Sequence, residues 1–134
     1  MNSKRPPILL SGLILGLFGL ANILLYYHSI FFLLLNGLAL ILWIYLTLAL
    51  VLSFADYRQD LQKPPFLSSF ATYPMASMLL ASYLSKLGLF WVGQLLWYMA
   101  LLLHIFLIVI FTWKYVLKAE GLALTPSWTV LYVG

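Results

Sequence analysis

The sequence predicts an all-α protein whose helices cross a membrane several times. Hydrophobic residues make up 65% of the 134-residue chain and charged residues only 7%, whereas soluble domains carry roughly a quarter charged residues. The charged residues are gathered in short segments between long apolar runs, as in multi-pass helical membrane proteins. We therefore expect the formal net charge of +4 to set the topology of the chain rather than to bind nucleic acid.

The first span is expected at residues 8–27, directly after Pro6 and Pro7. Proline is tolerated there because the first amides of a helix have no helical partner. Lys4 and Arg5 ahead of an apolar segment resemble a secretory signal. The segment is too long for one and no small-x-small cleavage site follows, so a retained span is predicted.

Three glycines share one face of this first span. Gly12, Gly16 and Gly19 fall within an arc of about 60° on a helix. Glycine lets another backbone, or a permeating solute, come close. This face is therefore expected to meet either a neighbouring helix or a pore.

The second span is expected at residues 30–54, which are rich in Leu, Ile and aromatic residues. Such a bulky composition is typical of a helix that faces lipid. A short polar segment that contains Asp56, Arg58, Asp60 and Lys63 follows it.

The third span, residues 67–85, mixes hydroxyl groups and a proline into an apolar run. Ser68, Ser69 and Thr72 fall within an arc of about 100°. Pro74 removes one backbone hydrogen bond and is expected to kink the helix. Small hydroxylated residues beside a proline suit a tight helix contact or a watery pore, and both interpretations stay open.

The fourth span is expected at residues 89–113, with Gln94 and His104 inside otherwise apolar sequence. An ionisable residue near the middle of a membrane is a functional-site hypothesis by default. The alternative is a neutral imidazole that is hydrogen-bonded to a neighbouring helix.

A fifth span is predicted to begin at residues 126–134, with Thr125 as the N-cap and Pro126 at the first position. This apolar run is too short to cross a membrane. We therefore expect the chain to be the N-terminal portion of a longer transporter or the product of an interrupted reading frame. The spans together form one membrane domain, residues 1–134.

The basic residues predict the orientation in the plasma membrane. If the N-terminus is cytoplasmic, the loops on the opposite side hold only Lys86. By the positive-inside rule, the N-terminus and the segment after the fourth span are then cytoplasmic. The cytoplasmic segments would carry Lys4, Arg5, Arg58, Lys63, Lys114 and Lys118.

The sequence offers no pattern for enzymatic chemistry. It contains no cysteine, no embedded nucleophile–base pair and no cluster of metal ligands, so no enzyme, cofactor or metal is expected. A small multidrug exporter would need a carboxylate within the membrane. Asp56, Asp60 and Glu120 all lie in predicted loops, which excludes that class.

Several stretches resemble one family of membrane proteins. KPPFLSSFATYPMASMLL is similar to the third-helix signature of the tellurite-resistance/dicarboxylate transporter (TehA-like) family, to which the slow anion channels of plant guard cells are related. In that signature a basic residue and proline precede a Leu-Ser-Ser-Phe run, and a proline with small residues and methionine follows. RPPILLSGLILGLFGLANIL resembles the first helix of the family, and TPSWTVLYVG resembles the start of the fifth.

The resemblance implies part of a ten-helix pore built from five helical hairpins. In the family the odd-numbered helices ring the pore, the even-numbered ones form an outer layer, and the bacterial representative is a homotrimer. The implied cargo is a small anion, such as tellurite or a C4-dicarboxylate. By resemblance, the candidates for the pore side are Gly12, Gly16, Gly19, Ser69, Thr72, Pro74 and Ser77.

Two functions therefore stay open at this stage. The first is the N-terminal portion of an anion channel or exporter, in contact with the lipid bilayer and with small inorganic or organic anions. The second is a small four-helix structural or accessory membrane protein without transport of its own.

Overall fold

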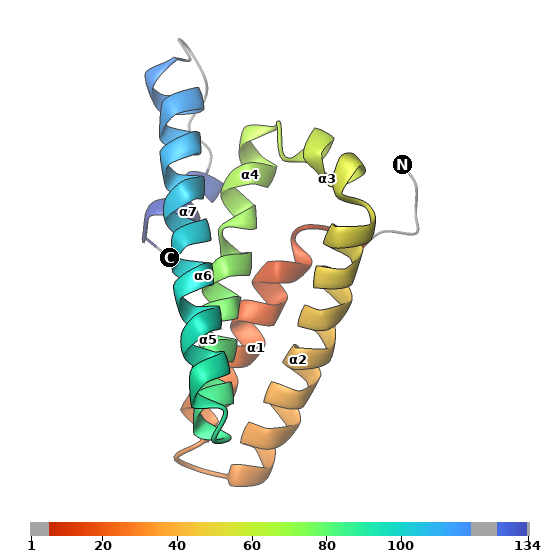
Figure 1. Cartoon of the computed structure of the whole chain (residues 1–134), viewed down its shortest axis with the longest axis vertical. Coiled ribbons are helices and arrows are strands. Elements are labelled where there is room, and N and C mark those ends of the chain that lie inside the picture. Colours follow the sequence, from red (N-terminus) through yellow and green to blue (C-terminus); the bar gives the residue numbers. More distant parts are fainter. Residues whose placement is uncertain (1–5, 119–125, 134) are drawn as a thin grey trace.

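The computed structural model describes residues 6–118 and 126–133, and over these residues it is an all-helical bundle (Figure 1). Helices α1, α2, α5 and α6 run along the long axis, and the connections α1–α2 and α5–α6 lie at its lower end in this view. The short helix α3 lies at the opposite end. The bounds are α1 Leu10–Leu24, α2 Ser29–Leu52, α3 Phe54–Asp60, α4 Pro64–Phe70, α5 Thr72–Lys86, α6 Phe90–Phe111, a π-helical continuation of α6 at Thr112–Leu117, and α7 Ser127–Val133.

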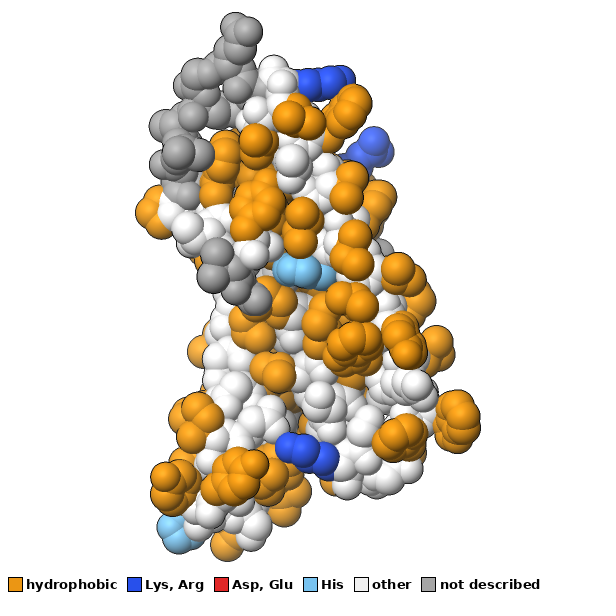
Figure 2. Space-filling model, turned by 90° about the vertical axis from the view of Figure 1, so that its left-hand side faces the viewer, with side chains coloured by type: hydrophobic (Ala, Val, Ile, Leu, Met, Phe, Trp, Pro, Cys, Tyr) orange, Lys and Arg blue, Asp and Glu red, His pale blue; other side chains and the backbone are white. Residues whose placement is uncertain are grey.

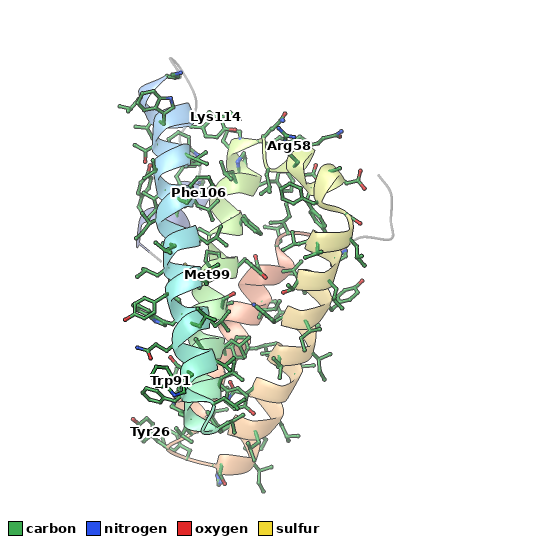
Figure 3. The ribbon with its side chains drawn as sticks, viewed as in Figure 1. Tyr26, Arg58, Trp91, Met99, Phe106 and Lys114 are labelled. Atoms are coloured by element: carbon green, nitrogen blue, oxygen red, sulfur yellow. The ribbon has the colours of Figure 1, made fainter. Side chains whose placement is uncertain are left out.

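Among the described residues, two helices are long and apolar enough to cross a membrane, and both present most of their surface outward. They are α2 and the continuous helix Phe90–Leu117, whose most apolar stretches are only 22% and 17% buried. Large side chains such as Leu52 and Trp91 are 82% and 83% exposed, and Figure 3 shows Met99 and Phe106 along the same helix as Trp91. Such surface suits lipid rather than water. α1 is a shorter apolar helix.

The helices pack as two hairpins joined through α1 and α5. α1 packs on α2 and on α5, and α5 packs on α6. Phe18 of α1, Leu46 of α2 and Leu80 of α5 are fully buried in the cluster that joins the three helices. A second cluster surrounds Phe111 at the upper end, where α7 packs on α4 and on α6.

The third predicted span is two helices, α4 and α5, which break at Ala71. Pro74 has no N–H to donate to the carbonyl of Phe70, so the helical ladder loses one bond. The Ala71 amide instead bonds Ser68 three residues back at 3.2 Å, and the next bond, from Met75 to Ala71, is long at 3.5 Å. The break therefore lies three residues before Pro74.

The last helical segments differ in detail from the sequence prediction. The helix predicted at 89–113 continues to Leu117 through the π-helical turn, which lets Tyr115 turn inward and donate to the carbonyl of Gln62. Residues 127–133 are helical, and the Thr129 hydroxyl bonds the Pro126 carbonyl at 2.6 Å. The predicted N-cap Thr125 and the terminal Gly134 lie outside the described residues.

At Gly93, α6 packs tightly against α5. A Cβ there would lie 2.6 Å from the Ala81 carbonyl oxygen and would also meet the Ser85 side chain. We expect Gly93→Ala to destabilise the protein by about 1–3 kcal/mol, because the two helices must separate. The midpoint of thermal unfolding in detergent measures this. Gly37→Ala, at a glycine with free space around it, is the control and should not be destabilised; equal midpoints for both variants would contradict the packing.

Pro74→Ala should make α4 and α5 one straighter helix, since residue 74 regains an N–H for the Phe70 carbonyl. The chain has no cysteine, so spin labels at two introduced cysteines near residues 66 and 84 can report the end-to-end distance. We expect the distance to lengthen in Pro74→Ala. Pro65→Ala, in the first turn of α4, should leave it unchanged. An unchanged distance in Pro74→Ala would assign the break to the neighbouring side chains instead.

Candidate functional site

The glycines of α1 form an open face. Ser11, Ile14, Phe18 and Ala21 are the buried residues of this helix. Around Gly12, Gly16 and Gly19, by contrast, no neighbouring atom lies within 4 Å of where a Cβ would stand. The GxxxG pair of α1 therefore does not serve helix packing within the described part of the chain, whereas Gly93 of α6 does.

The glycine face continues onto α5. Around the axis of α1, the glycines lie next to the residues that contact α5, on the side that is turned away from α2. On the same side α5 presents Met75, Met78 and Ser82, which are partly or fully exposed. We define the open face as these six residues: Gly12, Gly16, Gly19, Met75, Met78 and Ser82.

A pocket adjoins the open face at Ser82, toward the lower end of the bundle. Its volume is about 330 Å³, and it lies between α5 and α6. Ser82 and Ser85 of α5 line it together with Gln94 and Trp97 of α6. Polar groups thus reach this surface from two helices.

Two of the predicted pore residues, Ser69 and Thr72, lie at the helix break. The Thr72 hydroxyl lies 2.6 Å from that of Ser11 on α1 and 2.9 Å from the carbonyl of Ser69. The Ser69 hydroxyl donates to the Pro65 carbonyl at 2.7 Å. These hydroxyls satisfy backbone groups near the break and tie it to α1.

The other two, Pro74 and Ser77, are buried between helices. Ser77 accepts a hydrogen bond from the Trp43 indole of α2 at 2.9 Å and donates to the Tyr73 carbonyl at 2.9 Å. The Pro74 side chain is fully buried. The structure thus brings the three glycines together on the open face and places Pro74 and Ser77 away from it. A pore role for all seven candidates stays a prediction.

Sequence reasoning missed two residues that border the open face, Ser11 and Asn22. They lie eleven residues apart, which is three helical turns, so they share one edge of α1. Ser11 contacts Thr72, and the side-chain amide oxygen of Asn22 accepts a hydrogen bond from Lys86 at 3.1 Å. The three-turn spacing of the two polar residues beside the glycines was the available signal.

His104 of α6 lies against the same break. Its imidazole lies against the backbone of Ala71, and its Nδ1 is buried with no partner among the described residues. This contact matches the interpretation of a histidine that binds a neighbouring helix. In the described part of the chain, no three His, Cys, Asp or Glu side chains gather as metal ligands.

A comparison with protein-family models identifies the family of this chain. The model of SLAC1, described as voltage-dependent anion channel, matches residues 7–134. The chain belongs to the SLAC1 family of voltage-dependent anion channels. Searches of curated proteins and of solved structures gave no match.

Membership of the SLAC1 family confirms the resemblance drawn from the first-, third- and fifth-helix stretches. It also confirms three coarser predictions: a membrane protein, small anions as the transported class, and a channel or transporter rather than an enzyme.

The Ser11–Thr72 contact can be tested by a double-mutant cycle. Ser11→Ala and Thr72→Ala should each destabilise the protein, and the double variant should lose less than the sum. Interhelical hydrogen bonds in membranes contribute about 0.6 kcal/mol on average, so a coupling of that order is expected. Thermal unfolding of the four proteins in detergent measures it. Ser82→Ala, whose hydroxyl bonds only within α5, is the control; strictly additive losses would contradict the contact.

Proposed function

We propose that this chain supplies part of the wall of an anion-conducting pore, with the open face of α1 and α5 turned toward the permeating ion. The observation that carries the proposal is the free space around Gly12, Gly16 and Gly19. Three glycines on one face, unused by packing in the described chain, leave room for a solute. The SLAC1 family supplies the class of solute, a small anion.

The open face suits the passage of anions because its side chains are neutral. It carries no carboxylate among its six residues, so it does not repel a negative ion. The hydroxyl group of Ser82 lies on it and can turn from the Met78 carbonyl to donate a hydrogen bond to a passing anion. Selectivity in such a pore follows from its diameter and its donors. Tellurite, a C4-dicarboxylate or another small anion fits this description.

A pore needs an opposite wall. We propose that further helices of the complete channel supply it, that α2 and α6 form the outer, lipid-facing layer, and that the channel is a homotrimer. The outward apolar surfaces of α2 and α6 support the outer layer. Lys and Arg side chains concentrated at one end support an orientation with that end in the cytoplasm of a plasma-membrane protein; Figure 3 places Arg58 and Lys114 there, and Tyr26 and Trp91 at the opposite end.

Anion flux into proteoliposomes that contain the complete channel, with the helices of the opposite wall, tests the proposal. Gly16→Leu fills the open face, and it should lower the flux at least about tenfold, because a narrowed pore excludes the ion. Gly37→Leu is the matched control, since it adds the same side chain at a glycine that also has free space but lies on α2. The control should keep the wild-type flux.

Equal flux in the two leucine variants would overturn the assignment of the open face to the pore. A well-folded wild-type protein without anion flux would instead favour the accessory membrane protein, with the open face as a surface for another helix.

A further inference from the structure

Lys86 occupies a distinctive place at the lower end of the bundle. It is the last residue of α5. Its ammonium donates a hydrogen bond to the side-chain amide oxygen (Oδ1) of Asn22 on α1 at 3.1 Å, and it lies 5.6 Å from the centroid of the Phe32 ring on α2. One cation thus joins three helices.

Both partners of Lys86 are neutral, so they hold the ammonium without cancelling its charge. An amide oxygen and an aromatic face attract a cation through dipole and quadrupole. Lys63 at the other end differs, since its ammonium lies 3.7 Å from the carboxylate of Asp60. The described acidic residues, Asp56 and Asp60, both belong to α3 at that far end.

Lys86 also borders the open face. Asn22, which holds it, shares the edge of α1 that carries Ser11, and this edge flanks the three glycines. Ser82, one turn before Lys86 on α5, is part of the open face. On the face in view, Figure 2 shows Lys or Arg side chains toward the two ends, with no acidic side chain in sight.

We infer that Lys86 is the anion-attracting charge at one mouth of the pore, held in place by Asn22 and Phe32. This inference rests on the proposed function. A fixed, uncompensated cation beside a passage with low-dielectric walls concentrates anions at the entrance. The attraction extends over about 10 Å at 0.1 M salt and shrinks as salt rises, so it acts on entry rather than along the whole pore.

The local potential can be measured without any conduction. Ile23 is exposed and adjoins Asn22 on the glycine side of α1. Because the chain has no cysteine, Ile23→Cys provides a single thiol in the full chain, reconstituted in liposomes. Its reaction rates with an anionic and a cationic methanethiosulfonate reagent are compared, since their ratio cancels the ionisation of the thiol itself.

Lys86→Gln in this background should lower the anionic-to-cationic rate ratio about fivefold at low salt, as expected for one unit charge within about a nanometre. The difference should fade in high salt. Lys63→Gln, which removes a paired charge at the far end, is the control and should leave the ratio unchanged. An unchanged ratio in Lys86→Gln would overturn the inference while leaving the proposed pore intact.

Single-channel recordings in planar bilayers connect the potential to transport. Lys86→Gln should reduce anion conductance at low salt and approach the wild type at high salt, whereas Lys86→Arg should retain it. A conductance deficit that persists at high salt would show a structural role instead and overturn the inference. Absence of anion current from the wild type would overturn the proposed function, and the role of Lys86 with it.

Discussion

The need to satisfy backbone hydrogen bonds inside an apolar environment governs this bundle. Pro74 withdraws one donor from the helical ladder, and in lipid no water replaces it. The helix breaks at Ala71. Around this break, the hydroxyls of Ser68, Ser69 and Thr72 donate hydrogen bonds to nearby carbonyls. His104 of α6 lies against the backbone at the same place. The break is thus built from several neighbouring groups and not from the proline alone.

The break and the tight contact at Gly93 together decide how α5 lies against its neighbours. α5 packs tightly on α6 at Gly93 of α6. Its own Ser77 contacts α2, and its own Thr72 contacts α1. What remains of its circumference is the strip of Met75, Met78 and Ser82. That strip joins the glycines of α1, so a single continuous surface is left for a partner outside these helices.

The described charged residues of the molecule lie at its two ends. The upper end carries basic residues alongside the carboxylates of α3, and the Lys63–Asp60 pair is an example. The lower end carries Lys86 with neutral partners only. In a channel for anions the two ends would therefore present different fields to the ion, although the helices between them are almost uncharged.

Much of the architecture could be read from the sequence because hydropathy is a local property. The apolar runs gave helices close to their predicted places, and the stretch around Leu67-Ser68-Ser69-Phe70 led to the family that the match over residues 7–134 confirms. Pro74 was expected to kink the third span, and the helix breaks at Ala71, where the hydroxyls of Ser68, Ser69 and Thr72 bond nearby carbonyls.

The sequence by itself determined an all-helical membrane protein of the SLAC1 family with glycines gathered on one face of its first helix. Only the tertiary structure decided that those glycines stay open while Ser77 and Pro74 are buried. It also decided that Ser11 meets Thr72 and that Asn22 meets Lys86, across 61 and 64 residues of chain. The physical reason is that a helical face is buried or left open according to which helix packs beside it. The fold determines that neighbouring helix, and local periodicity does not.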